Sequence, residues 1–237
     1  MSDPAHPTHR VSVLRDANTP SGAADDQAFG RSAERRPRLQ STLARMAAHV
    51  IRRRNQVVRE ADLTIPRGPT PWALDEWPIE IGPENIDTLM TPELLVFLGG
   101  DSVRRSLDGI RGGNRLIVVS DHEGYAAYGH IVVNSEEYLR VLGEREPVPY
   151  LGNFFTAPRA RRRGLFEKVH NESQRVLQRL GYRRVVGEAR PTNVGSIKGG
   201  ERMGMRVIRH FTGWVICEAL VIQRDILNGG PWQVVRR

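Results

Sequence analysis

The chain has 237 residues, of which 39% are hydrophobic, enough for one folded domain with an additional segment. No apolar run approaches the roughly 20 residues needed to cross a bilayer. The N-terminus lacks the apolar centre of a signal peptide, and its aspartates are unlike an acid-poor transit peptide. We therefore expect a cytoplasmic protein with no transmembrane segment. The net charge of +8 comes almost entirely from arginine, since Lys168 and Lys198 are the only lysines.

The first 76 residues are expected to lie outside the compact domain. Residues 1–36 are rich in Pro, Ser, Ala, Gly and Asp with few large apolar side chains, which predicts a disordered segment. In the segment 37–76, apolar residues recur roughly at helical spacing from Arg38 to Ala61, with arginines on the other faces. This pattern predicts an amphipathic helix. Such a helix could pack on its own domain, on a second copy of the chain in a homodimer, on another partner or on an anionic membrane surface.

A Pro-rich linker at residues 65–71 precedes the predicted compact domain, which covers residues 77–237. Runs rich in Val, Ile and Leu between turn residues indicate strands, and glycines end the helical patterns. In chain order, the patterns predict a strand (77–81), helices (83–89, 93–98 and 101–110), two strands joined by a turn (115–120 and 125–134), a strand (149–156), a helix (164–180), a strand (184–188), a helix (193–203) and a final strand or hairpin (207–224).

The junction between the strand 149–156 and the helix 164–180 predicts an anion-binding site. An apolar run ends at Pro158, four arginines occupy five positions from Arg159 to Arg163, and Gly164 begins the helix. The first turn of a helix presents backbone N–H groups without internal partners, and the helix dipole adds partial positive charge there. Because glycine lets the backbone approach a phosphate and arginine offers forked donors, we expect a phosphorylated ligand.

Two motifs resemble those of the GNAT family of acyl-CoA N-acyltransferases. The family's pyrophosphate loop reads Arg or Gln, two residues, Gly, one residue, then Gly or Ala, and Arg161–Phe166 is similar to it except for Phe166 in the last place. Downstream, the family pattern places a small residue, a tyrosine and a glycine at fixed distances after an asparagine. These positions are occupied here by Asn193, Ser196, Gly200 and Gly204. The resemblance covers roughly residues 77–225.

The resemblance implies a mixed α/β fold of the α+β type. Its central sheet would be mostly antiparallel, with about six to seven strands flanked by helices, and would splay between its fourth and fifth strands, 149–156 and 184–188. Acetyl-CoA or another acyl-CoA would be the co-substrate, with the pantetheine arm filling the splay like an added strand. The coenzyme-binding residues implied are Phe154, Phe155, Thr156, Arg161, Arg162, Arg163, Gly164, Leu165, Phe166 and Asn193.

The chemistry implied by the resemblance is direct transfer of an acyl group to an amine, which needs a base for the ammonium proton and an acid for the leaving thiolate. Glu188 and His130 are candidate bases from their strand positions. Gly200 replaces the tyrosine that often serves as the acid, and Ser196, Tyr182 or water could substitute. Tyr150 and Asn153 border the expected acyl site and would orient the substrate. The acceptor could be an amino sugar, another small metabolite or a protein amine.

Cofactor chemistry of other kinds is not expected. The histidines lack ligand spacing and no carboxylate cluster accompanies them, so we predict no metal site. Cys217, the only cysteine, lies in an apolar strand context that predicts a buried packing thiol and disfavours a covalent relay.

Two further hypotheses remain open at the level of sequence. One is a non-catalytic module of the same fold that binds acyl-CoA. The other is a basic nucleic-acid-binding protein, although the basic runs contain few aromatic residues for stacking on bases, and no specific nucleic acid is expected.

Overall fold

The computed structural model describes residues 51–99, 107–133, 136–144, 146–217 and 219–236. Predictions for residues 1–50 and for the start of helix 101–110 fall outside this range, although residues 107–111 are helical. The elements are β1 (Ile51–Asp62), β2 (Trp77–Ile81), α2 (Ile86–Leu89), α3 (Pro92–Leu98), β3 (Arg115–Asp121), β4 (Gly124–Val132), α5 (Glu136–Leu142), β5 (Tyr150–Thr156), the 3-10 turn η1 (Pro158–Ala160), α6 (Leu165–Arg179), β6 (Arg184–Ala189), α7 (Val194–Arg202), β7 (Arg206–Ile216), β8 (Leu220–Asp225) and β9 (Gln233–Arg236).

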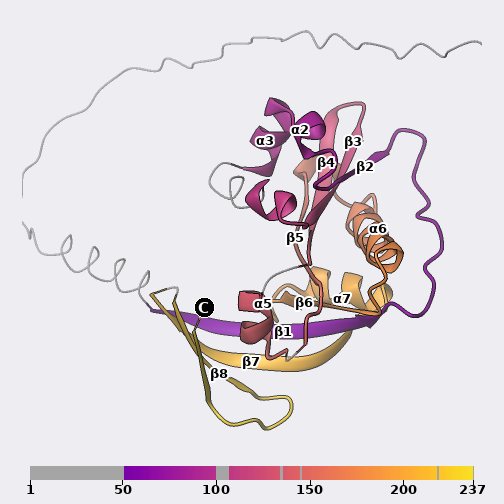
Figure 1. Cartoon of the computed structure of the whole chain (residues 1–237). Helices are drawn as coiled ribbons and strands as arrows, with labels where there is room; N and C mark the ends of the chain where they lie inside the picture. Colours follow the sequence, from indigo (N-terminus) through magenta and orange to yellow (C-terminus); the bar gives the residue numbers. More distant parts are fainter. Residues whose placement is uncertain (1–50, 100–106, 134–135, 145, 218, 237) are drawn as a thin grey trace, which may run out of the picture.

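One sheet of nine strands, ordered β2-β3-β4-β5-β6-β1-β7-β8-β9, runs through the molecule. All neighbours are antiparallel except β5 and β6. The predicted mixed, mostly antiparallel sheet is confirmed, but the predicted number of six to seven strands is wrong. The sequence patterns missed β1 in the middle of the sheet and β9 at its edge. Figure 1 shows β2–β4 running at a steep angle to β1 and β7.

The amphipathic helix predicted up to Ala61 is wrong for the residues that the structure describes. Residues 51–62 form β1, which pairs with β6 on one side and β7 on the other. The apolar spacing here fits a helix as well as a strand, and pairing on both edges decides in favour of the strand. Val58 is fully buried in this position. The sheet of the domain predicted at 77–237 therefore includes residues that precede it.

The sheet opens between β5 and β6, as the resemblance implied. These two strands pair only through Tyr150 with Val186 and Leu151 with Gly187. Beyond this point β5 stays paired with β4, and β6 stays paired with β1. A bulge in β5, where Asn153 has a left-handed backbone (φ 52°), turns the strand away from β6. The facing edges therefore keep unpaired backbone groups.

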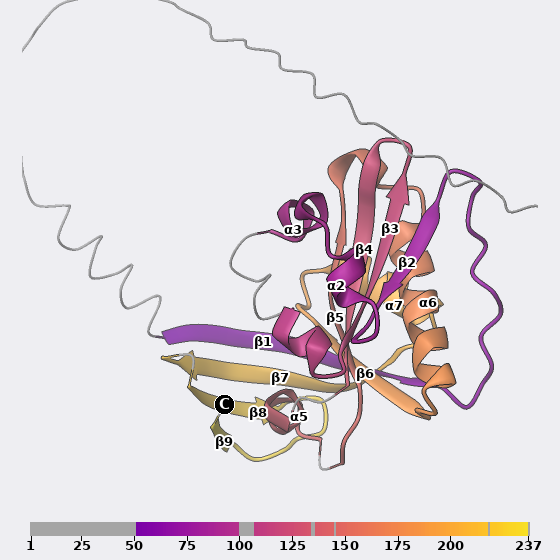
Figure 2. The ribbon, with the colours of Figure 1, turned by 45° about the horizontal axis from the view of Figure 1, so that its top comes forward.

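Helices cover both faces of the sheet. Against one face, α6 packs with Leu165 and Val169 on the interior residues of β3, β4 and β6. On the other face, α2 and α3 cover β2 and β3, and α5 covers the buried side of β1 and β6 around Val58 and Val186. In Figure 2, α6 and α7 lie on the same side of the strands. The N-terminal ends of α6 and α7 thus both reach the opening between β5 and β6.

Two smaller findings bear on the predictions. No helix in the described part of the chain is long and apolar enough to cross a membrane. The prediction that Cys217 is buried is wrong, because its thiol is exposed in the turn between β7 and β8, where the backbone has a φ of 49°.

Candidate functional site

The turn between β5 and α6 presents a row of free backbone donors. Gly164 begins α6 with a left-handed backbone (φ 75°) that favours glycine, and Arg162 before it also has a positive φ of 68°. Open space surrounds the position that a side chain at Gly164 would occupy. Among the described residues, no acceptor receives the amides of Arg162 to Phe166. This is the geometry that binds an anion at a helix start.

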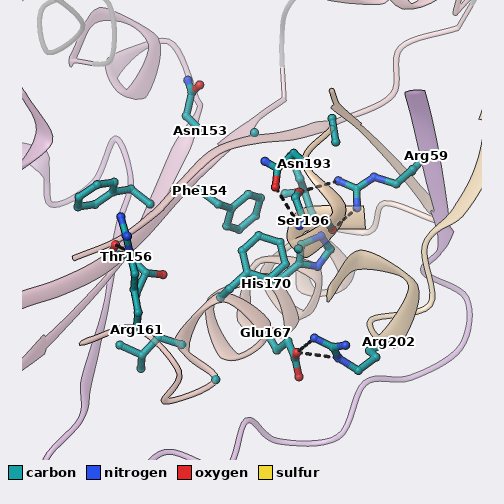
Figure 3. Close-up of a pocket in the computed structure, with 18 of the residues that line it drawn as sticks. Arg59, Asn153, Phe154, Thr156, Arg161, Glu167, His170, Asn193, Ser196 and Arg202 are labelled. Atoms are coloured by element: carbon teal, nitrogen blue, oxygen red, sulfur yellow. Dashed lines mark hydrogen bonds and ion pairs between the residues drawn. The ribbon is translucent and has the colours of Figure 1, made fainter. Parts of the chain in front are cut away.

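A cavity of about 710 Å³ opens from this turn and extends through the gap in the sheet. Most of the predicted site residues line it, including Glu188, Ser196 and the opposing edges of β5 and β6 (Figure 3). The predicted residues on its wall are Asn153, Phe154, Phe155, Thr156, Arg161, Arg162, Gly164, Leu165, Phe166, Glu188, Asn193 and Ser196. Asn193 caps α7 by accepting a hydrogen bond from the Ser196 amide at 3.1 Å.

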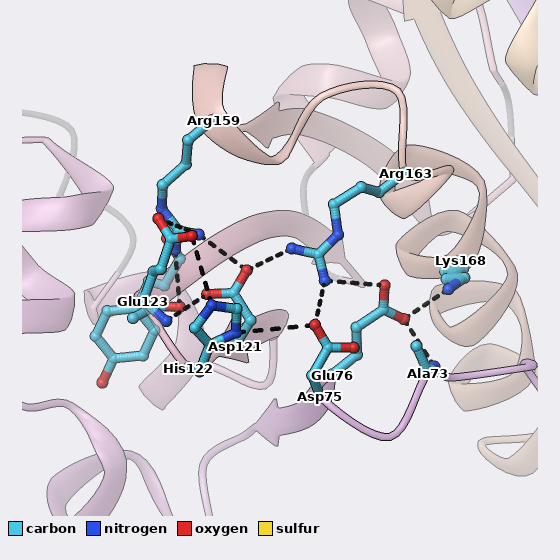
Figure 4. A network of polar contacts seen from close by, with 11 residues as sticks. Ala73, Asp75, Glu76, Asp121, His122, Glu123, Arg159, Arg163 and Lys168 are labelled. Carbon is cyan, nitrogen blue, oxygen red and sulfur yellow. Dashed lines mark hydrogen bonds and ion pairs between the residues drawn. The ribbon is translucent and has the colours of Figure 1, made fainter.

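Arg163 is predicted at the coenzyme, but its side chain points elsewhere. Its guanidinium binds Asp121 at 2.7 Å and Asp75 at 3.0 Å, and it is absent from the cavity wall (Figure 4). Arg159 also binds Asp121, at 2.9 Å. The Asp121 side chain is fully buried, and hydrogen bonds from Arg159, from the Glu123 amide and from Arg163 lower its pKa to about 2. These two arginines therefore anchor the turn, and Arg161 and Arg162 face the cavity.

Two other predicted residues lie away from the cavity wall. His130 lies on β4, with its ring against Tyr128 at 5.6 Å, and burial lowers its pKa to about 4. It is neutral at physiological pH and too weak a base for an ammonium group. Tyr150 is buried in the core beneath Gly152, where its ring fills the space that a side chain at Gly152 would need. Neither side chain lines the cavity.

Glu188 lies at the end of β6. Of the two candidate bases, Glu188 lines the cavity and His130 does not. The Glu188 carboxylate is largely buried and pairs with Arg54 of β1 at 3.2 Å. Ser196 turns its hydroxyl and its carbonyl toward Arg59. Glu188 projects from the sheet face covered by α5, because Val186, two residues earlier, packs there. The cavity therefore meets both faces of the sheet.

Arg59 and His170 are cavity residues that the sequence did not indicate. Arg59 lies on β1, which was expected to be a helix, and nothing in the spacing links it to α7. His170 stacks on Phe154 at 5.1 Å, and burial, followed by the charges of Arg59 and Arg67, lowers its pKa to about 3. His170 follows Phe166 by one helical turn, and this spacing was the signal that could have identified it.

The glycines of α7 make room for these neighbours. A side chain at Gly199 would lie 2.6 Å from the Phe166 ring, and one at Gly200 would lie 2.1 Å from Nη1 of Arg59. Gly200 is the position at which the resemblance expects a tyrosine. The structure fills the corresponding space with the guanidinium of Arg59.

No protein-family model matches the chain, and no curated protein matches it. Among solved structures, the chain is similar to a tandem GNAT protein from the clavulanic acid biosynthesis pathway, with 13% identity over 84% of this chain and 61% of that chain and a TM-score of 0.52. It is also similar to a GCN5-related glucosamine N-acetyltransferase region of a fungal multi-domain β-N-acetylglucosaminidase, with 14% identity over 76% and 23% of the two chains and a TM-score of 0.50. A Drosophila protein matches with 14% identity over 75% and 56% and a TM-score of 0.51.

The chain spans less than two thirds of the length of each of these three structures. At these identities the likeness concerns the fold. The chain has the fold of the GCN5-related N-acetyltransferases, which confirms the resemblance stated from the two motifs. Within the described residues, no group of His, Cys, Asp and Glu side chains is arranged to hold a metal ion.

Proposed function

We propose that the protein is an acyl-CoA-dependent N-acyltransferase that moves an acyl group, with acetyl as the first choice, from coenzyme A to an amine. The observation that carries the proposal is the row of amides from Arg162 to Phe166, which have no acceptor among the described residues and open into a cavity running through a gap in the sheet. Coenzyme A combines a diphosphate with an extended arm containing amides. Its two recognition elements therefore match the free amides of the turn and the unpaired edges of β5 and β6.

The positively charged turn adds to this match. Arg161 and Arg162 line the cavity. Asp121, at the end of β3, pairs with the flanking Arg159 and Arg163 and so holds the turn in place. With the diphosphate at the turn, the pantetheine arm follows β5 past Thr156 and Phe154. The thioester then lies near Glu188, Ser196 and Arg59, at the other end of the cavity.

The transfer is proposed to be direct. Glu188, the carboxylate at the acyl end of the cavity, accepts the ammonium proton from the amine, either directly or through a water molecule. Cys217 does not line the cavity, so it offers no covalent relay. The acceptor enters from the sheet face on which Glu188 lies, and an amino sugar, another small metabolite or a protein amine are the classes to screen.

The test is a calorimetric titration of the full chain with coenzyme A, using Gly164→Glu as the diagnostic variant. A carboxylate at this position would repel the diphosphate from the free amides, so affinity should fall at least a hundred-fold. Gly229→Glu is the matched control, because Gly229 also has a positive φ (65°) and open space around it, but lies outside the cavity. Equal affinity in the two variants would contradict the proposed site.

Turnover is then measured by release of free thiol from acetyl-CoA with a panel of amines. Thiol release that depends on both the amine and Gly164 supports the acyltransferase. Tight binding without thiol release for any amine would instead support a non-catalytic acyl-CoA-binding module. This second function is considered because Gly200 stands where the resemblance expects the tyrosine acid.

A further inference from the structure

Arg59 is a buried cation that has no carboxylate partner in the described part of the chain. The residue is only 4% exposed, its guanidinium donates to the Ser196 carbonyl at 2.6 Å, and its contact with the Ser196 hydroxyl is long, at 3.4 Å. Its Nε is buried with no hydrogen-bond acceptor. Burial lowers the pKa of Arg59, and the more distant Glu201 and Tyr150 offset only part of this cost of holding a charge away from water.

Two other arginines of the sheet have carboxylate partners, although each shares with Arg59 a buried Nε that has no acceptor. Arg54, on the same strand and similarly buried, is matched by the Glu188 carboxylate, and Arg115 is matched by Glu80 and Glu84. Arg59 differs from both because the surface it faces is the cavity. A buried guanidinium on a cavity wall that pairs with no carboxylate is complementary to a ligand atom that carries or develops negative charge.

The guanidinium of Arg59 lies on the face of the sheet opposite to Glu188. Ala61, two residues along β1, packs with α6, so Arg59 projects from the same sheet face as α6 and α7. Its neighbour in the ladder on β6 is Gly187, which has no side chain to obstruct it. Glu188, the proposed base, projects from the opposite face. Figure 3 shows the Arg59 side chain reaching from β1 to the start of α7.

We propose that Arg59 contacts the sulfur of the acyl thioester and stabilises the thiolate that leaves, as a catalytic residue of the reaction. The inference rests on the proposed function and adds a residue to it. An amine that loses its proton on the Glu188 side attacks the carbonyl carbon from that face. Attack from that face bends the other substituents of the carbonyl carbon, the sulfur among them, toward the opposite face, where the guanidinium lies, and the sulfur leaves when the carbonyl re-forms.

The amine nitrogen forms a bond to the carbonyl carbon, and the π pair of the carbonyl moves to its oxygen. When that pair returns, the carbon–sulfur bond breaks and the sulfur leaves with the bonding pair as a thiolate. Arg59 keeps its proton throughout, because guanidinium groups are not deprotonated in proteins. The protons of the amine pass to Glu188 and to water, and the released thiolate is protonated by water.

The experiment compares the full chain and its Arg59→Met variant for affinity toward coenzyme A and desulfo-coenzyme A, which lacks the thiol. Binding is measured by calorimetry between about pH 6.5 and pH 9.5, a range that spans the ordinary pKa of a thiol. A neighbouring guanidinium lowers a thiol pKa by roughly one unit or more, which makes the thiolate bind about ten-fold more tightly than the thiol. The wild-type affinity for coenzyme A should therefore rise about ten-fold across this range.

Arg59→Met should abolish this rise, while its affinity for desulfo-coenzyme A stays equal to that of the wild type at every pH. Arg59→Lys, which keeps a charge on a different geometry, should retain part of the rise. Arg206→Met is the control, because Arg206 is an exposed arginine of β7 outside the cavity, and it should behave as the wild type.

The outcomes separate the two proposals. Equal pH dependence for coenzyme A and desulfo-coenzyme A in the wild type would overturn the role of Arg59 and leave the coenzyme site standing. An equal rise with pH in the affinity for coenzyme A in wild type and Arg59→Met would also overturn the role of Arg59. If the wild type bound neither ligand, the proposed function itself would fail and the role of Arg59 with it. The wild-type comparison decides the question even if Arg59→Met does not fold.

Discussion

Single charged residues have two separate tasks around the cavity. Asp121 is fully buried and fixes the turn through Arg159 and Arg163, whereas Arg161 and Arg162 are left to face the cavity. The arginine-rich sequence therefore serves partly as internal structure, and only part of its charge is available to a ligand. Sequence alone could not show which arginines pair internally and which face the cavity, because the pairing depends on Asp121, which lies on a distant strand.

Asp121→Asn should lower the free energy of unfolding at neutral pH by about 2 kcal/mol, because two half-buried guanidinium groups each lose one carboxylate partner, the fully buried one. The pKa of Asp121 in the folded state, about 2, lies below its usual 3.8. Its contribution is therefore fully present above the usual pKa and is lost as the pH falls from about 4 to about 2. Denaturant unfolding across this pH range measures the difference between wild type and variant.

The control for this prediction is Asp87→Asn, which removes an exposed ion pair with Arg111. Surface pairs contribute little, so its stability should stay within about 0.5 kcal/mol of the wild type at every pH. A loss of stability in Asp121→Asn that does not shrink at acidic pH would contradict the account of the network.

Among the helices and strands, local sequence patterns predicted those with a clear apolar period. They missed β1, whose conformation depends on pairing with other strands. The hairpin of β3 and β4, the strand β5 and the helix α6 follow from alternation, turn residues and an apolar stripe, and the structure confirms them. β1 was predicted as a helix because its few apolar residues fit either period. Its conformation follows from hydrogen bonds to β6 and β7, more than 100 residues away in sequence, which no local signal contains.

The position of β1 predicts that a proline at Val58 abolishes folding of the whole sheet. Val58 is fully buried and pairs with both β6 and β7, so Val58→Pro removes a ladder hydrogen bond and a packed side chain, a loss of at least ~3 kcal/mol. Leu74→Pro is the control, since Leu74 is fully exposed before β2. Circular dichroism and thermal unfolding of the full-length variants distinguish them. A folded Val58→Pro with wild-type Tm would show that β1 is not integral.

At the scale of the whole molecule, the cavity combines residues from distant parts of the chain. The β5–α6 turn and the Asn193 cap of α7 carry local signals, and the sequence predicted both. Arg59 and His170 carry no motif, and they reach the cavity because β1 enters the middle of the sheet and α6 turns one face toward β5. The fold, the β5–α6 turn and the cavity residues Glu188 and Ser196 are thus accessible from sequence, whereas Arg59 and His170 require the tertiary structure.

The central claim is that the backbone amides from Arg162 to Phe166 bind the diphosphate of coenzyme A. Amide resonances of the full chain, followed by NMR during titration with coenzyme A, test it most directly. These five amides have no acceptor in the part of the chain that the structure describes, so in the free chain they should exchange rapidly with water. Coenzyme A should shift their resonances strongly and slow their exchange. If the coenzyme binds while these amides keep their positions and their rapid exchange, the claim is wrong.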